Sequence, residues 1–353
     1  MYDTLEEWRP TIDETIESLL PRSVDPAYLA EMFGEPTYTY DPEAVQRALS
    51  DPIWTLLDRG GKRWRAVLFL CFIEAVGEDP ESYLEYALVP EVLHNGTIIV
   101  DDVEDGATHR RGGPALHHSH GTDVALNAGN AMYFLPLKVI ARNPGDLPAE
   151  LQLAAYEMLT VELNRTHLGQ GMDICWHNER EINVTEPEYL EMCACKTGCL
   201  GRIVARLSAI VTDNRGLEED IARYAERLCV AFQIADDVLD IEHAFEEGGR
   251  FGKGVGNDIR EGKKTLPVIH AAANGDPEDV ARLESLLWAE ENTDEEVLEA
   301  IEILRRTDSV EYARGVASEL SVEAKGHIDD LDLATEPRRK LEAFADFVVQ
   351  RDI

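Results

Sequence analysis

The apolar residues of this chain recur three and four positions apart, which is the period of an amphipathic α-helix. Long examples run through residues 151–159 and 222–232, and the stretch 203–211 is apolar on most of its faces. Glycine and proline gather between such stretches, at 143–145 and 274–277. Because sustained alternation and short β-branched strands are missing, the pattern predicts an all-α fold, a single large helical bundle with central helices.

No linker, internal repeat or low-complexity tract interrupts this helical pattern. We therefore expect residues 1–353 to form one domain. Its parts are amphipathic N-terminal helices in 1–50, a core in 58–270 that carries every motif described below, and acidic helices in 276–353 that complete the bundle.

The sequence shows no run of 18 apolar residues, so we expect no membrane span. The acidic first residues, MYDTLEEWRP, differ from a signal peptide. Six cysteines are too few and too scattered in 353 residues for a disulfide framework. These features together predict a reduced, cytoplasmic protein.

The balance of charge adds a constraint on partners. Asp and Glu number 69 against 33 Lys and Arg, so the net charge is −36. Such a field repels nucleic acid and anionic lipid. Because the acidic residues are spread along the whole chain rather than gathered in a tail, we interpret them as the solvated surface of a protein from a salt-adapted, halophilic cell.

Two clusters of carboxylates have the form D-D-x-x-D, and each follows an apolar stretch. Asp101, Asp102 and Asp105 form the first cluster, and residues 236, 237 and 240 form the second. Residues four apart share one face of a helix, where like charges repel unless a cation lies between them. Carboxylate oxygens in this arrangement suit Mg²⁺, which takes one or two carboxylates and completes its shell with water and phosphate.

Basic residues surround both clusters in the sequence. Arg110 and Arg111 follow the first cluster, and GGKRWR precedes it with Lys62 and Arg65 three positions apart. The segments KTG, at Lys196, and GKK follow later in the chain. Arginine grips phosphate with a planar fork and lysine as a point charge, so the mixture predicts Mg²⁺-bridged diphosphate. A P-loop is absent from the sequence, which excludes that kind of nucleotide site.

These motifs resemble the trans-isoprenyl diphosphate synthases, and the geranylgeranyl diphosphate synthases in particular. The resemblance covers about residues 58 to 270 and rests on the segments GGKRWR, EVLHN, DDVED with RRG, HGTDVALNAGNAMYFLPL, GQGMDICW, KTG, FQIADDVLD and GKGVGNDIREGKKTLP, in the order of the family. It implies an all-α fold around a deep central cavity, a homodimer, and three Mg²⁺ ions per active site, with Mn²⁺ as a substitute.

The resemblance also assigns roles to residues. Two ions would be held by Asp101 and Asp105 and the third by Asp236 with Asp240 nearby, while Asp102 and Asp237 would assist in catalysis beside them. Isopentenyl diphosphate would contact Lys62, Arg65, His94 and Arg111. The allylic diphosphate, whether dimethylallyl, geranyl or farnesyl, would contact the residues Arg110, Lys196, Thr197, Gln233, Lys253 and Lys263.

The chemistry that follows is head-to-tail condensation. The bases and the metal ions neutralise the leaving diphosphate, the double bond of isopentenyl diphosphate attacks the allylic cation, and a proton is lost. Gly96 and Thr97, one turn before Asp101, and Leu93, a turn deeper, would line the pocket for the growing chain, one isoprene unit per turn of about 5.4 Å. Because Gly96 and Thr97 are small, we predict a twenty-carbon product; twenty-five or more remains open, with Tyr133 or Phe134 as a floor.

Several residues allow other interpretations. Cys193, Cys195 and Cys199 with His177 could suggest zinc, but their spacing fits no common zinc pattern, and helix packing explains them better. The histidines at 117, 118 and 120 favour a loop or packing role over metal. Rival functions are a non-catalytic prenyl-diphosphate-binding subunit, which would normally lack one aspartate cluster, and a terpene cyclase or a head-to-head coupling enzyme. Cyclases usually carry an N-S-E type signature that this chain lacks.

Overall fold

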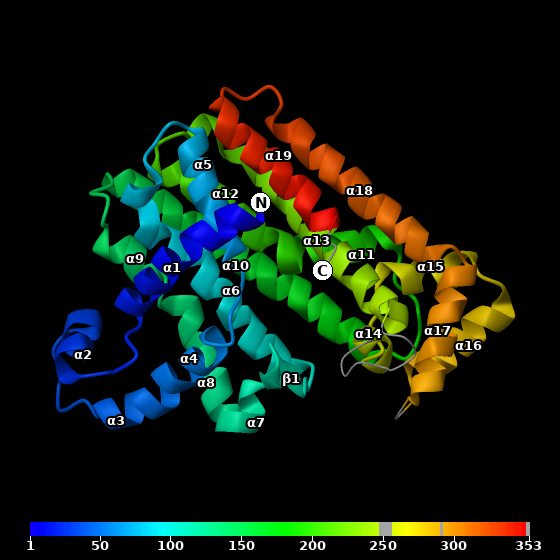
Figure 1. Ribbon diagram of the computed structural model, residues 1–353. Coiled ribbons are helices and arrows are strands. Elements are labelled where there is room, and N and C mark those ends of the chain that lie inside the picture. The colour runs from blue at the N-terminus through cyan, green and yellow to red at the C-terminus, as the bar shows by residue number, and fades with distance from the viewer. Residues whose placement is uncertain (247–255, 290–291, 351–353) are drawn as a thin grey trace. The chain divides into compact units, whose positions relative to one another are not determined.

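Helices carry most of the chain, as the spacing of apolar residues predicts (Figure 1). The computed structural model describes residues 1–246, 256–289 and 292–350. Within them the strands are β1 (His109–Arg110) and β2 (Gly113–Pro114), an antiparallel pair that turns the chain after the first aspartate cluster. The all-α prediction is therefore confirmed. Lys253, a predicted ligand of the allylic diphosphate, lies outside the described residues.

The chain divides into two compact units, and both contain segments that are distant in sequence. Unit 1 comprises Met1–Leu159, Val204–Glu218 and Asp332–Arg338, and unit 2 comprises Thr160–Ile203, Glu219–Leu331 and Arg339–Ile353. The helices α10 (Ala149–Asn178), α12 (Cys199–Val211), α13 (Glu218–Glu246) and α19 (Thr335–Val349) have residues in both. The expectation of a single domain stays a prediction.

Unit 1 is built around two long apolar helices, α5 and α6, whose side chains Phe69, Phe72 and Tyr86 are fully buried. The α5 helix ends beside the short segment 332–338, where the Ala334 amide donates to the Ala75 carbonyl at 2.9 Å. The helices of this unit are α1 (Tyr2–Leu19), α2 (Pro26–Phe33), α3 (Pro42–Val45), η1 (Gln46–Ser50), α4 (Asp51–Leu57), α5 (Trp64–Ala75), η2 (Pro80–Tyr83), α6 (Leu84–Glu104), α7 (Leu116–His120), α8 (Thr122–Phe134), α9 (Leu137–Arg142) and η4 (Arg215–Leu217).

Unit 2 has a separate apolar core, to which α11, α13 and the helices after them contribute buried residues such as Ile234, Leu266 and Leu283. Capping boxes start two of these helices, with Thr185 and Glu188 at α11 and Thr293 with its Glu partner at α17. The remaining helices of this unit are α11 (Glu186–Cys193), η3 (Ala194–Gly198), α14 (Asn257–Arg260), α15 (Leu266–Asn274), α16 (Pro277–Leu287), α17 (Asp294–Arg306) and α18 (Ser309–Ile328).

One stretch, Thr122–Arg142, is long and apolar enough to pass for a membrane span by length and composition alone. Half of its most apolar window is buried inside the fold. It covers two packed helices, α8 and α9, and Ala125, Met132 and Ile140 within it are fully buried. Packing within unit 1 therefore accounts for the buried part of its apolar character.

Candidate active site

The first aspartate cluster occupies the last turn of α6, in unit 1. Asp101 and Asp105 are half-buried, whereas Asp102 is buried. The β1–β2 hairpin brings Arg110 back to this turn, and its Nε donates to Asp102 Oδ1 at 2.8 Å. Burial raises the pKa of Asp102 above its ordinary value, although the bond from Arg110 opposes that rise. Arg110, a predicted diphosphate ligand, is thus paired with a carboxylate of the same unit.

A basic cluster of unit 1 gathers most of the residues predicted to bind isopentenyl diphosphate. His94 on α6 lies near Arg65 and Arg111, and their positive charges together with burial hold its pKa well below the ordinary range. His94 Nδ1 is buried without a hydrogen-bond partner among the described residues. Lys62 is exposed instead, with its ammonium 5.4 Å from the ring centroid of Tyr2.

The loop before α5 shapes this basic cluster. Gly60 and Gly61 have φ values of +92° and +143°, which side-chain-bearing residues rarely adopt. The Arg111 guanidinium donates to the Gly60 carbonyl at 2.7 Å. A β-carbon at Gly61 would lie 3.4 Å from Arg111 Nη1 and 2.9 Å from Nη1 of the Arg63 guanidinium. The two glycines therefore let two guanidinium groups approach the backbone.

Arg63 is a residue whose role the sequence did not reveal. Its side chain is buried, its Nε donates to Asp13 Oδ1 at 2.7 Å, and its Nη1 lies 3.6 Å from Glu91 Oε1. Asp13 belongs to α1 and Glu91 to α6, so one arginine connects the N-terminal helix, the loop and the helix of the first aspartate cluster. Residues 1–50 therefore contribute to the site by supporting this loop.

The second aspartate cluster lies on α13, in unit 2, with different partners. Asp237 accepts hydrogen bonds from Tyr189 Oη at 2.7 Å and Gln233 Nε2 at 3.0 Å, and both donors are neutral. Burial raises the pKa of Asp237 to about 7. Asp240 accepts the backbone amides of Asn257 and residue 258 at 3.3 and 3.1 Å, which ties α13 to α14.

Lys196 and Thr197 lie on η3, beside α13. Lys196 Nζ donates to Asp173 Oδ2 at 2.6 Å, and Thr197 Oγ1 donates to Gln233 Oε1 at 3.2 Å. Lys263 lies 2.7 Å from Glu261 and 3.8 Å from Asp258. One solvent-open pocket of about 450 Å³ in unit 2 is lined by the residues Asp173, Tyr189, Met192, Cys193, Lys196, Thr197, Gln233, Asp237, Asp258, Lys263, Lys264 and Thr265.

Seven of the twelve residues that line the pocket were not assigned to the site by sequence reasoning, among them Asp173, Tyr189, Asp258 and Lys264. Asp173 belongs to the GQGMDICW segment, so the sequence offered a signal for it. Nothing in the sequence indicated Tyr189, whose hydroxyl donates to Asp237 of the second cluster. Asp258 is a third buried carboxyl, and burial together with Asp237 raises its pKa well above the ordinary value. Lys264 is buried, unlike its neighbour at 263.

The residues predicted to set chain length divide between two environments. Gly96 faces α8, where a β-carbon would lie 2.8 Å from Met132 Cβ and 3.0 Å from the Gly129 carbonyl oxygen. Its small size is therefore required by the close crossing of α6 and α8. Leu93 is buried, and Thr97 is half-buried with its hydroxyl donating to a main-chain carbonyl in the preceding turn at 2.7 Å.

The two aromatic residues named as alternative floors also differ. Tyr133 is buried near the carboxylates of Asp101 and Glu104, which together with burial raise its pKa far above the ordinary value. It therefore lies at the acidic end of α6. The Phe134 side chain is 68% exposed in this chain.

Several cysteines and histidines of the alternative metal sites make other contacts. The Cys199 thiol lies 2.7 Å from Thr166 Oγ1 and 2.6 Å from the Cys195 carbonyl. The rings of His117 and His118 lie 4.2 Å apart, and the third histidine of that cluster contacts the Thr55 hydroxyl at 3.1 Å.

The donor set fits Mg²⁺ in the form that the sequence predicts. Asp101 and Asp105 lie one turn apart at the end of α6, and the second cluster offers the same pair on α13. In the described part of the chain no three His, Cys, Asp or Glu residues group as ligands of one ion. Mg²⁺ does not need such a group, because water and phosphate complete its shell. The carboxyl groups crowded at Asp237, Asp240 and Asp258 have raised pKa values, which a bound cation would oppose.

Known proteins resemble this chain over most of its length. The sequence profile described as polyprenyl synthetase matches residues 46–304. A short chain isoprenyl diphosphate synthase of Methanocaldococcus jannaschii is 37% identical over 84% of this chain and 87% of its own. A geranylgeranyl pyrophosphate synthase of Geoglobus acetivorans is 34% identical over 88% and 92%. The crystal structure of geranylgeranyl pyrophosphate synthetase from Pyrococcus horikoshii superposes with a TM-score of 0.84 at 29% identity, covering 99% of this chain and 98% of that one.

Proposed function

The chain belongs to the polyprenyl synthetase family, and from that premise we propose that it joins isopentenyl diphosphate to an allylic diphosphate, head to tail. The observation that supports this most is the pairing of two D-D-x-x-D clusters with cationic side chains in each unit. A carboxylate cluster with its own basic residues suits a phosphate group bridged by divalent cations. A non-catalytic subunit would not need both clusters.

In this proposal the chain's own residues bind and orient two diphosphates. Arg65, His94 and Arg111 hold isopentenyl diphosphate, with neutral His94 donating or accepting a hydrogen bond as its tautomer allows. Lys196 and Lys263 hold the allylic diphosphate, each released from its present carboxylate partner when the more highly charged ligand arrives. Magnesium, when bound through Asp101, Asp105, Asp236 and Asp240, supplies charge neutralisation for the departing pyrophosphate.

The bond changes balance without a protein-derived reactant. The allylic C–O bond breaks and pyrophosphate leaves with the electron pair. The isopentenyl double bond forms the new C–C bond, and its C2 proton passes to the departing pyrophosphate. The reaction requires that the cation be shielded from water, which would otherwise capture it as an alcohol.

We propose geranylgeranyl diphosphate, with twenty carbons, as the product. Relatives from several organisms carry that name, and position 97, which is half-buried on α6, is occupied by a small residue. Thr97→Phe is expected to shorten the product, and an unchanged product would locate the floor elsewhere. A product of twenty-five or more carbons is the alternative within the same reaction.

The test is incubation with labelled isopentenyl diphosphate, Mg²⁺ and each allylic starter in turn, followed by sizing of the product. Elongation to twenty carbons supports the proposal. Hydrocarbon formed from the allylic substrate alone would indicate a cyclase, and binding without turnover would indicate a regulatory subunit.

We also propose an oligomeric state and a cellular environment for the enzyme. We expect a homodimer, because Val161 and Leu168 leave an apolar strip on α10, 53% and 59% exposed, and light scattering after gel filtration tests it. The charge of −36 supports a cytoplasmic enzyme of a halophilic cell, for which thermal stability should rise with KCl.

A further inference from the structure

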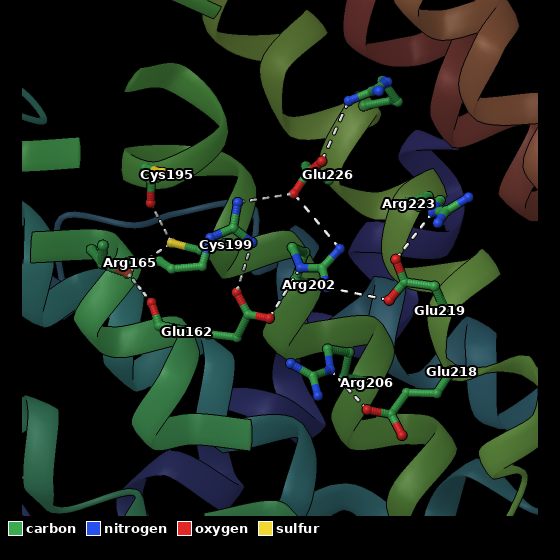
Figure 2. Close-up of polar contacts among 12 residues, drawn as sticks. Glu162, Arg165, Cys195, Cys199, Arg202, Arg206, Glu218, Glu219, Arg223 and Glu226 are labelled. Carbon is green, nitrogen blue, oxygen red and sulfur yellow. Dashed lines mark hydrogen bonds and ion pairs between the residues drawn. The ribbon is translucent and has the colours of Figure 1, made fainter. Parts of the chain in front are cut away.

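One face of α10 in unit 2 runs along η3 and the start of α12 as a continuous stripe. Glu162, Thr166, Gly169 and Asp173 are spaced four, three and four residues apart, so they share one face of the helix. At the first of these positions, Arg202 Nε donates to the buried Glu162 carboxylate at 3.0 Å (Figure 2). The stripe ends at Asp173, which holds the ammonium of Lys196.

A distorted turn of helix, η3, packs against the middle of this stripe. The segment η3 is a π-helical turn, wider than an α-helical one, and such turns are frequent at functional sites. The Cys199 thiol donates to the Cys195 carbonyl inside this turn at 2.6 Å, as Figure 2 shows, and it also meets the Thr166 hydroxyl of α10 at 2.7 Å. Polar contacts therefore fix the turn to α10 on one side of Gly169.

At Gly169 the backbone of α10 lies very close to the backbone of η3. A β-carbon there would lie 2.3 Å from the Lys196 backbone nitrogen and 2.8 Å from both Lys196 Cα and the Cys195 carbonyl carbon. All three are main-chain atoms, so no side-chain rotation could relieve the clash. Gly171, two residues later on the same helix, is exposed and has no atom within 4 Å of its virtual β-carbon.

We propose that Gly169 is a positioning residue for Lys196. The missing side chain lets the π-helical turn approach α10 closely enough for the ammonium to reach the pocket beside Asp173. The Thr166–Cys199 contact holds the turn at that height. This inference rests on the proposed function, because Lys196 is there a ligand of the allylic diphosphate. Any residue larger than glycine at 169 would push the main chain of Lys196, and with it the ammonium, away from α10.

The experiment compares Gly169→Ala with Gly171→Ala in the full-length enzyme. Because a displacement of about 1 Å in a binding group is enough to cost up to about 10²-fold, we expect Gly169→Ala to raise the KM for the allylic diphosphate on the order of tenfold or more. The KM for isopentenyl diphosphate should stay unchanged. Gly171→Ala should alter neither value.

A third variant separates positioning from loss of stability. In Gly201→Ala, the new β-carbon would lie 2.5 Å from the Ala225 carbonyl oxygen, so α12 and α13 would be strained instead. We expect this variant to lower the unfolding temperature without a selective change in the allylic KM. If it shifted the two KM values in the same way as Gly169→Ala, the effect would be general strain and the proposal would be overturned.

A double-mutant cycle with Lys196→Ala shows whether the effect passes through the lysine. If Gly169 acts through Lys196, then Gly169→Ala should add nothing to the allylic KM once Lys196 is alanine. Additive losses would overturn the proposal. Should Gly169→Ala fail to fold, Thr166→Val is measured in the same cycle, with a several-fold rise in the allylic KM expected and no rise as the contradicting result.

A readout that does not depend on turnover keeps the two proposals separate. The rate of reductive methylation at Lys196, relative to Lys138 in the same sample, is followed by mass spectrometry. This relative rate of methylation should change several-fold in Gly169→Ala and should stay the same in Gly171→Ala. A wild-type enzyme that fails to elongate overturns the proposed function, whereas unchanged Lys196 reactivity in Gly169→Ala overturns the positioning role.

Discussion

The two D-D-x-x-D clusters have the same sequence form, but their central aspartates have different hydrogen-bond partners. In unit 1, the central Asp102 is bound by the guanidinium of Arg110 at 2.8 Å. In unit 2, the central Asp237 is bound by a phenol and an amide, and its pKa is raised to about 7. The first cluster therefore holds a neutralised carboxylate, and the second holds one that gains from added positive charge.

This difference indicates that the middle aspartates of the two clusters have different structural roles. Asp102 anchors the hairpin that follows α6, so its role is to place Arg110 and the residue after it. Asp237 is connected through Gln233 to Thr197 on η3, so its role is to join α13 to the turn that carries Lys196. We propose that the outer aspartates of both clusters share the task of metal binding.

The largest effect is expected where the two clusters should behave alike. Asp101→Ala and Asp236→Ala should each lower kcat by at least about 10²-fold, because each removes a ligand of the ions that neutralise the leaving group. Steady-state kinetics measures this, with circular dichroism as the control for unchanged helicity. Near-normal activity in either variant would remove that aspartate from the metal site.

Substitution of the middle aspartate should lower the free energy of unfolding more in the first cluster than in the second. Asp102→Asn replaces the charged partner of Arg110 and should lower the free energy of unfolding by about 1–3 kcal/mol. Asp237→Asn keeps a neutral acceptor for Tyr189 and should cost less than about 1 kcal/mol without Mg²⁺. Urea denaturation of both variants gives the comparison. Equal losses would mean that the surroundings of the clusters do not differ in the way the contacts indicate.

The basic cluster of unit 1 should have its own pH dependence. The pKa of His94 is lowered by burial and by Arg65 and Arg111, so the folded protein keeps this ring neutral. The unfolded chain binds a proton near the ordinary value of about 6.5, so the stability contribution is present above that pH and is lost as pH falls. Between pH 6.5 and 5.5 the wild type should lose about 1 kcal/mol that His94→Asn does not lose.

The control for this prediction is His109→Asn, which changes an exposed histidine of the same unit. It should follow the wild type over the same pH range. If His94→Asn followed the wild type as well, the ring would not be held neutral by its surroundings.

A smaller effect on substrate binding is expected when a residue that supports the basic cluster of unit 1 is changed. Asp13→Asn weakens the 2.7 Å contact with Arg63 and should raise the KM for isopentenyl diphosphate several-fold, since the loop before α5 loses an anchor. The allylic KM, which depends on unit 2 in this account, should not change. Asp3→Asn, on an exposed turn of α1, is the matched control. A change in both KM values would show that α1 supports more than this loop.

Much of this arrangement could be predicted because helical period and charge are local signals. Both aspartate clusters were found on helices, and Lys196, Thr197 and Gln233 were found together in one pocket. Tyr189 could not be found in this way, since it meets Asp237 across 48 residues of sequence. Arg63 was overlooked between two predicted ligands, because burial against Asp13 and Glu91 depends on how three helices pack.

Two glycines likewise have roles that depend on tertiary packing and could not be predicted from the local sequence. Gly96 was interpreted as an opening in a tunnel wall, and its small size is accounted for by the crossing with α8. Gly169 begins the GQGMDICW segment, but the sequence alone offered no structural reason for it, because helix interiors disfavour glycine and the reason exists only where another backbone comes close.

The central claim is that both aspartate clusters act on one diphosphate through bound magnesium. The most direct measurement is a crystal structure of the enzyme with Mg²⁺ and a non-hydrolysable thio analogue of farnesyl diphosphate. The account predicts a single diphosphate whose ions are ligated by Asp101 and Asp105 on one side and by Asp236 on the other. Ions at the two clusters that contact separate ligands, or a diphosphate bound at one cluster alone, would contradict it.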